Sequence, residues 1–132
     1  MKKVTPFLMF QDGIAEEAMN YYISIMKDSE IKSIIRYGAN ETGDEGTVMQ
    51  ATFSIKGQEF MCIDSNLKHQ FSFTPSFSIF VDCDTEEEIN SLYQNLIEGG
   101  QALMPIGDYG FSQRFGWLND RFGISWQLNL PF

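Results

Sequence analysis

The first part of the chain has a hydrophobic pattern that predicts a strand followed by a helix. Residues 4–10 form an apolar run that ends at Gln11-Asp12-Gly13, which is typical of a buried strand. Apolar side chains then recur every three or four positions across 14–26, as on the inward face of an amphipathic helix. We expect Asp12 near the N-cap of that helix, because a short polar side chain there accepts hydrogen bonds from free backbone N–H groups.

The next segment predicts three strands. Weak alternation marks the first, at 31–37, and a polar, glycine-containing loop over 38–46 separates it from the second. The second and third strands, at 48–55 and 59–63, are joined at Lys56-Gly57, which is a hairpin signal.

The same order of elements begins again after a connection at 66–75. Residues 77–81 predict a strand, and the polar residues 82–85 predict a helix cap. A helix opens at Glu86 and ends before Gly99-Gly100. The strands expected after it lie at 102–105, 115–119 and 124–130, with a glycine-rich loop at 106–114 and a turn at 120–123.

The two halves can be laid over each other at several matching positions. Asp12 matches Asp82 and Gly57 matches Gly123, at a spacing of about seventy residues. Each half has the order β-α-β-β-β, so we predict an α+β fold in which tandem βαβββ repeats form curled antiparallel sheets around a cleft. We expect one domain over 1–132, with repeats at about 1–66 and about 74–132.

The chain is acidic, and this limits its partners. It has 18 Asp and Glu against nine Lys and Arg, a formal net charge of −9 at pH 7. That charge repels phosphate backbones and anionic lipid, so neither nucleic acid nor a membrane surface is an expected partner. It favours a cationic ligand, or alternatively it serves solubility alone.

The two cysteines are expected to be small core residues. Cys62 and Cys83 lie in apolar strands and do not form a C-x-x-C pair. The N-terminus lacks the apolar core of a secretory signal, and no run approaches the ~18 apolar residues of a membrane span. We therefore expect a cytoplasmic protein with reduced thiols.

Two stretches carry a resemblance to a known superfamily. One is Thr5-Pro6-Phe7-Leu8-Met9-Phe10 with Ala15-Glu16-Glu17-Ala18, and the other runs from Leu103 through Gln127. With the βαβββ duplication, they resemble the vicinal oxygen chelate superfamily, which includes glyoxalase, bleomycin-resistance proteins and ring-cleaving dioxygenases. The closer similarity is to its PhnB-like branch, labelled demethylubiquinone methyltransferase-like. The resemblance covers nearly the whole chain and implies the glyoxalase fold.

The resemblance also implies where a metal would sit. In metal-using members, four ligands, typically His and Glu, come from the first and last strand of each half. By motif these positions are Thr5, Met61, Ser76 and Gln127. Such side chains are poor ligands for a divalent metal, so we expect no metal there. The single histidine, His69, lies in the connection between halves, where a solvated loop residue is the plain interpretation. We also find no glycine-rich strand-to-helix turn for an adenosyl cofactor, and expect no cofactor.

The remaining candidate is a cleft that binds a small organic molecule. Because strand side chains alternate between faces, Met9 shares a face with Thr5, and Phe80 shares one with Ser76. The expected ligand-binding residues are Met9, Met61, Phe80, Tyr109, Arg114, Trp126 and Gln127. Trp126 fits least well, since its neighbour Gln127 points the opposite way. Alternatively these side chains fill the cleft, and Arg114 belongs to an ion pair with a nearby Asp.

Three functions are compatible with this sequence. The first is a protein that binds a small molecule in a metal-free cleft. The second is a metal-dependent enzyme of the superfamily, of lyase or dioxygenase type, with a displaced metal site. The third is an interaction module that works as a dimer. Relatives in the superfamily commonly pair through their sheets, so the resemblance implies a homodimer.

Overall fold

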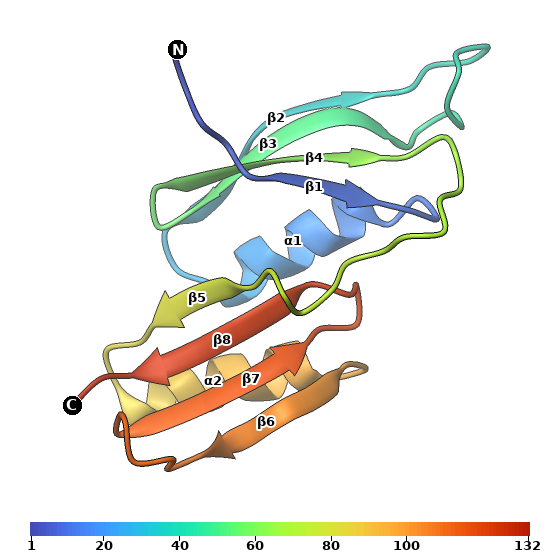
Figure 1. Cartoon of the computed structure of the whole chain (residues 1–132). Coiled ribbons are helices and arrows are strands. Elements are labelled where there is room, and N and C mark those ends of the chain that lie inside the picture. Colours follow the sequence, from blue (N-terminus) through green and yellow to red (C-terminus); the bar gives the residue numbers. More distant parts are fainter. The chain divides into compact units, whose positions relative to one another are not determined.

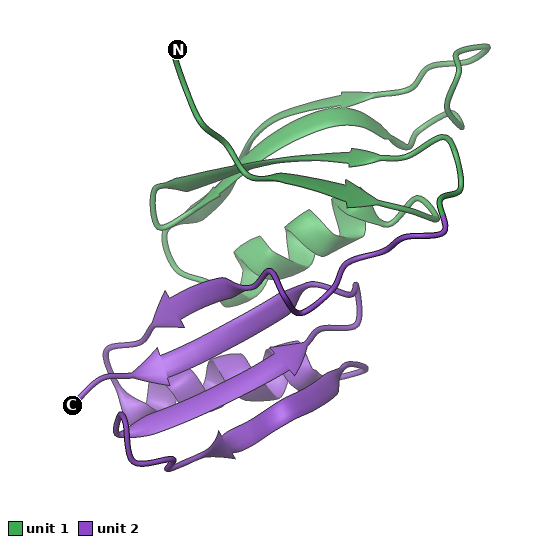
Figure 2. Ribbon diagram, in the orientation of Figure 1, with its two compact units in different colours: residues 1–69 green, residues 70–132 purple.

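Two copies of one β-α-β-β-β unit make up the chain, as the sequence predicts. A computed structural model describes all residues, 1–132, and divides into compact units at 1–69 and 70–132 (Figure 2). These limits lie close to those of the predicted repeats.

The elements of each unit follow one another along the chain (Figure 1). The first unit contains β1 (Phe7–Phe10), α1 (Ala15–Ile25), β2 (Ser29–Arg36), β3 (Val48–Ile55) and β4 (Gln58–Asp64). The second contains β5 (Ile79–Asp82), α2 (Glu86–Ile97), β6 (Gln101–Gly107), β7 (Arg114–Asn119) and β8 (Ser125–Leu130). Their four-stranded sheets have the orders β1-β4-β3-β2 and β5-β8-β7-β6. Neither helix is long and apolar enough to cross a membrane.

Each sheet is mixed, which corrects the antiparallel sheets expected from the sequence. β1 runs parallel to β4, and β5 runs parallel to β8, while the other neighbouring strands are antiparallel. The first strand of each unit is followed by a helix, and such a crossover allows it to lie beside the last strand in the same direction. Hydrophobic periodicity reports which face of a strand is buried and contains no information on the direction of a distant neighbour.

One face of each sheet packs on the helix of its own unit. In α1 the buried side chains are Ala15, Ala18, Met19 and Tyr22, all of which the helical spacing predicts. In β4 the side chains alternate, so that Phe60 and Cys62 are buried while Met61 is partly exposed. Burying one large apolar side chain stabilises a fold by about 1.5–3 kcal/mol, so this layer holds each unit together. We call the opposite side of each sheet its open face.

The cysteines lie in these cores, which confirms their expected role. Cys62 and Cys83 are both buried, but only Cys62 lies in a strand, because β5 ends at Asp82 and Cys83 belongs to the segment before α2. Burial raises the pKa of each thiol to about 12, with smaller contributions from nearby carboxylates such as Asp64 and Glu88. Neither thiol is therefore a reactive thiolate near neutral pH.

The start of α1 differs from the prediction. Asp12 has a φ of 66°, and the N-cap position is taken by Ile14, which has no side-chain cap. The buried carboxylate of Asp64, at the end of β4, instead accepts hydrogen bonds from Ala15 N at 2.9 Å and Val48 N at 2.8 Å. One side chain therefore caps the helix from 49 residues away and also fixes the start of β3.

The start of α2 is capped locally, as predicted. Thr85 is the N-cap residue, and its hydroxyl accepts a hydrogen bond from Glu88 N at 3.1 Å. The Glu88 carboxylate in turn accepts from Asp84 N at 2.8 Å, so nearby side chains satisfy both donors. The three glutamates of the first turn also oppose the positive end of the helix dipole.

A buried carboxylate organises the turn between β7 and β8. Asp120 is 4% exposed, and its Oδ1 accepts hydrogen bonds from Phe122 N at 2.8 Å and Ile124 N at 3.0 Å. Its Oδ2 accepts a third from the indole Nε1 of Trp126 at 2.8 Å. The carboxylate thereby joins the turn to a core side chain of β8.

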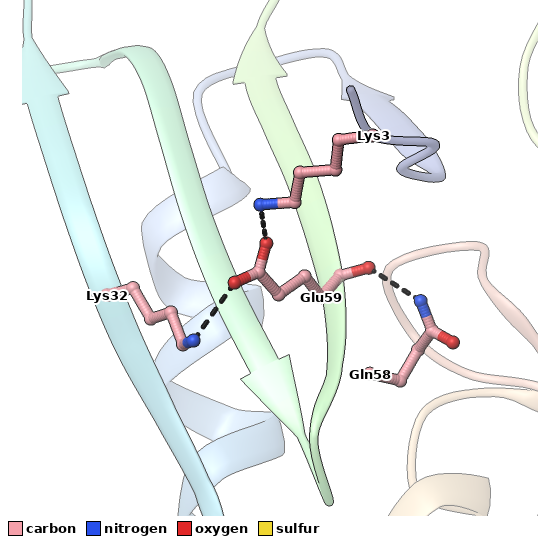
Figure 3. A network of polar contacts seen from close by, with 4 residues as sticks. All are labelled: Lys3, Lys32, Gln58 and Glu59. Carbon is pink, nitrogen blue, oxygen red and sulfur yellow. Dashed lines mark hydrogen bonds and ion pairs between the residues drawn. The ribbon is translucent and has the colours of Figure 1, made fainter. Parts of the chain in front are cut away.

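An ion-pair network connects the N-terminal segment to the first sheet. Figure 3 shows Glu59 of β4 between Lys3 and Lys32, with an ion pair to each and a distance of 2.9 Å to Lys32. Gln58 donates a further side-chain hydrogen bond to the Glu59 carbonyl oxygen. Surface pairs of this kind add little stability, but they fix the position of a chain end.

We expect this attachment to weaken in acid. The hydrogen bonds from Lys3 and then Lys32 lower the pKa of the Glu59 carboxyl in the folded chain. A lowered pKa stabilises the folded state above the unfolded-state pKa of about 4.3, and this contribution is lost as the pH falls through the folded-state pKa. An NMR titration from about pH 6 to 3 should therefore show the Lys3 amide shifting together with the Glu59 carboxyl.

Two variants control that titration. Glu59→Gln should abolish the coupled shift of Lys3, whereas Glu45→Gln, at an exposed residue without an ion pair, should leave it intact. A Lys3 amide that does not respond to pH would show that the pair is absent in solution.

Candidate functional site

Four aromatic rings gather on the open face of the second sheet. Phe80 comes from β5, Phe115 from β7, and Tyr109 and Phe111 from the loop between β6 and β7. The ring centroids of Phe111 and Phe115 are 5.0 Å apart, and those of Tyr109 and Phe115 are 6.3 Å apart, both edge to face. Tyr109 stacks on Phe111 at 6.2 Å, and Phe80 lies 6.5 Å from Phe115. We call these four residues the ring cluster.

The ring cluster has a buried centre and exposed surroundings. Phe115 is only 5% exposed, whereas Phe80, Tyr109 and Phe111 are 53%, 42% and 58% exposed. Single exposed apolar residues are common, but three exposed rings in contact with one buried ring form a continuous apolar surface. Such surfaces often mark a place where another molecule binds.

The loop that carries two of the rings is anchored at both ends. The Tyr109 hydroxyl donates a hydrogen bond to the carbonyl oxygen of Pro105, and Gly110 N donates to Asp108 Oδ1 at 2.9 Å. At the other end, Gln113 N donates to the carbonyl oxygen of Leu130 at 2.9 Å. These bonds hold Tyr109 and Phe111 next to Phe115, so the ring cluster is built before any ligand arrives.

Polar side chains adjoin the rings on the same face. Gln127 of β8 lies directly opposite Phe80 on one side and Trp117 on the other. Its Nε2 donates a hydrogen bond to Ser78 Oγ at 2.7 Å, and Trp117 Nε1 donates to Ser125 Oγ at 2.9 Å. The side-chain amide of Gln127 thus lies beside the apolar surface of the rings, and a few placed polar groups beside apolar surface are what orient a small molecule in a binding site.

Two predicted site residues lie on the other side of this sheet. Trp126 is fully buried, and Arg114 Nε donates a hydrogen bond to Asn90 Oδ1 of α2 at 2.7 Å. Alternation explains both placements, because Trp126 precedes Gln127 and Arg114 precedes Phe115. The bond to Asn90 also takes the place of the ion pair considered for Arg114. Of the predicted site residues, the structure therefore brings Phe80, Tyr109 and Gln127 together on the open face.

Met9 and Met61 lie together in the first unit. They occupy the open face of adjacent strands, with Phe7 opposite Met61 and Met9 opposite Ile63. This strip is apolar but has no ring cluster and no amide comparable to Gln127. A role for these two methionines in binding stays a prediction.

Thr5 and Ser76, two of the positions implied for a metal, lie outside the strands, and no group of metal-binding side chains surrounds them. Thr5 precedes β1, and Ser76 precedes β5, where its hydroxyl is 2.7 Å from that of Thr74. The strand begins later than predicted, so Ser78 and not Ser76 adjoins Gln127. His69 lies in the connection, with Nε2 at 3.1 Å from Ser65 Oγ. No three His, Cys, Asp or Glu side chains are close enough together to hold a metal ion.

A polar groove of about 560 Å³ lies elsewhere, in the first unit. It is bordered by residues 11–13, by the loop around Asp44 and by the chain after β4. The buried carboxylate in its lining, Asp64, already accepts hydrogen bonds from two backbone N–H groups, and the Asp12 carboxylate is 3.8 Å from Lys68. We therefore place the candidate site at the ring cluster, where exposed apolar surface and an amide coincide.

Comparison with protein families identifies the chain. The family model described as 3-demethylubiquinone-9 3-methyltransferase matches residues 2–129. The chain belongs to this family. A solved structure of a PhnB protein from Bacillus cereus, described with the same methyltransferase name, is 57% identical. It covers 98% of this chain and 99% of its own, with a TM-score of 0.94.

More distant solved structures share the fold. A protein from Pseudomonas aeruginosa is 26% identical over 99% of this chain and 98% of its own, with a TM-score of 0.85. A glyoxylase/bleomycin resistance protein/dioxygenase domain from Frankia is 14% identical, with a TM-score of 0.67 over 100% and 99% of the two chains. The predicted glyoxalase-like fold is therefore confirmed. No curated protein matches the sequence.

Three residues of the candidate site are not predicted by the sequence pattern. Phe111 and Phe115 are two of them, and the third is Ser78, which lies beside Gln127 where the pattern predicts Ser76. Phe115 follows Arg114 in the same strand. Because successive strand side chains point to opposite faces, only one of these two residues can lie on the open face. The position of Phe111 depends on a loop conformation and has no periodic signal.

Proposed function

We propose that the chain binds a small organic molecule on the open face of the second sheet. The apolar part of the ligand packs on the ring cluster, and a polar group of the ligand bonds the amide of Gln127. One observation carries this proposal: three exposed rings surround a buried ring directly beside a presented amide. A hydrophobic surface supplies affinity, and a few placed polar groups supply orientation.

The family description is compatible with this ligand class. It names a methyl transfer to a demethylubiquinone, which is a ring compound with oxygen substituents. Aromatic pairs contribute about 0.5–1.5 kcal/mol beyond their buried area, so Phe80 and Phe111 are suited to a ring-bearing ligand. We take from the description the chemical class of the ligand and not the reaction.

We propose that binding needs no metal. The side chains beside the rings are an amide and hydroxyls, and Gln127 is hydrogen-bonded to Ser78. Neutral oxygen donors of this kind hold a divalent ion weakly without carboxylate or imidazole partners. Dialysis against a chelator is therefore expected to leave the affinity of the site unchanged.

A fragment titration tests the proposal. Neutral phenols, naphthols and indoles are added to the isotope-labelled protein, and amide shifts are followed by NMR. We expect the bound fragments to shift residues of β5, β8 and the Tyr109 loop. Phe80→Ala and Phe111→Ala should each weaken binding at least about fivefold, or ~1 kcal/mol, through lost ring contact. Phe115 is left unchanged because it is buried.

A matched control comes from the same unit. Phe77 is 61% exposed and forms no ring pair with the ring cluster, so Phe77→Ala should leave fragment affinity unchanged. Fragments that shift only the polar groove of the first unit would refute the proposal. So would affinities that neither cluster variant changes.

A further inference from the structure

The ring cluster combines aromatic faces with an acidic environment, and we infer that its ligand is an organic cation with an alkylated ammonium group. This inference rests on the proposed function and adds the charge of the ligand to it. The observation behind it is that three exposed rings lie in a unit whose only two basic side chains are engaged away from the rings.

The rings supply attractive surface for a positive charge. A ring face carries excess negative charge, and a cation within about 6 Å of the ring centroid is attracted to it. Phe80, Tyr109 and Phe111 are all about half exposed, and Phe115 forms the buried floor between them. Each of the three exposed rings contacts Phe115, so their attraction for an ammonium group is concentrated on one patch of the sheet.

Acidic side chains strongly outnumber basic ones in the second unit. Residues 70–132 contain two basic side chains, Arg114 and Arg121, against eight acidic ones, a balance of −6. Arg114 points to the helix side and bonds Asn90, and the Arg121 guanidinium lies 4.4 Å from the ring centroid of Phe122. Neither arginine therefore occupies the ring cluster, so an external cation meets no basic residue of this unit there.

Two carboxylates adjoin the rings. Asp82 lies two residues after Phe80 on the same face of β5, where its Oδ1 accepts a hydrogen bond from Asn129 Nδ2 at 2.9 Å. Asp108 precedes Tyr109 in the loop and accepts a bond from Gly110 N. Both charges are fixed in place by these bonds, and an anionic ligand would be repelled by them.

A pair of isosteric probes isolates the effect of charge. Choline is compared with its neutral isostere, in which a tert-butyl group replaces the trimethylammonium group, by NMR titration of the full chain at low salt. We expect choline to bind at least about fivefold more tightly than the neutral probe, with shifts at β5, β8 and the Tyr109 loop. Added salt should reduce this difference by screening the carboxylates.

Two substitutions separate the contribution of the rings to choline binding from that of the carboxylates. Phe111→Leu keeps an apolar side chain but removes a ring, so it should reduce the preference for choline. Asp82→Asn should reduce choline affinity about two- to threefold and leave neutral fragments unaffected. Asp84→Asn, at an exposed residue of the same unit outside the ring cluster, is the matched control.

The outcomes separate this inference from the proposed function. Equal affinities for choline and its neutral isostere would overturn the inference but leave fragment binding at the rings intact. Neutral fragments that bind while choline does not would do the same. If neither the charged nor the neutral probes bind at the ring cluster, both the inference and the proposed function are wrong.

Discussion

Replacing Asp120 by alanine is expected to lower the free energy of unfolding by about 3–5 kcal/mol. The carboxylate is buried and accepts hydrogen bonds from Phe122 N, Ile124 N and the indole of Trp126. Its removal leaves three donors without their partner, and each unsatisfied buried group costs about 1–3 kcal/mol. Urea unfolding followed by tryptophan fluorescence measures the loss, and an unchanged slope with denaturant identifies it as a change in stability.

The matched control is Asp108→Ala. Asp108 accepts a single backbone hydrogen bond in an exposed turn, so its removal should cost less than about 1 kcal/mol. If both variants lose the same small amount, the Asp120 carboxylate does not organise the β7–β8 turn. Asp120→Asn, which keeps one acceptor oxygen, should fall between the two.

Gly100→Ala is expected to cost about 3 kcal/mol or more. A Cβ at this position would lie 2.1 Å from the carbonyl oxygen of Asn119 and 3.0 Å from Asp120 Cα. Both atoms belong to the backbone, which cannot rotate away as a side chain does, so the end of α2 must move away from the β7–β8 turn. Thermal unfolding by circular dichroism measures the effect.

Gly46→Ala serves as the control for loss of a glycine. A Cβ there meets nothing within 4 Å, but φ is 86°, so only the left-handed backbone is penalised, by about 1–2 kcal/mol. A Gly100 variant no less stable than the Gly46 variant would show that the close approach is relieved easily. Gly100 and Asp120 adjoin one turn, so the costs of the two substitutions should not add.

Hydrophobic periodicity predicted the order of elements because each helix and strand buries its own side chains. The buried face of α1 and the type I′ turn at Lys56-Gly57, where both residues have positive φ, follow from local chemistry. The parallel pairing of β1 with β4 and the cap from Asp64 join residues about fifty positions apart, and local propensity does not report such contacts.

Alternation puts Phe80 on the same face of its strand as Ser76, and in the structure Phe80 lies directly opposite Gln127. A role for Phe80 and Gln127 in binding stays a prediction. Arg114 and Trp126 were included despite neighbours that point the other way. Tyr109 was found, but its partner Phe111 was missed, because a loop held by hydrogen bonds to Pro105 and Leu130 determines where both rings lie.

The different helix caps imply that the two helices are capped at different stages of translation. Thr85 and Glu88 are already present when α2 emerges from the ribosome, so that helix can start alone. The cap of α1 comes from Asp64, which is translated 49 residues after Ala15. The half that is made first is thus expected to be the one whose helix is capped only after its last strand has been made.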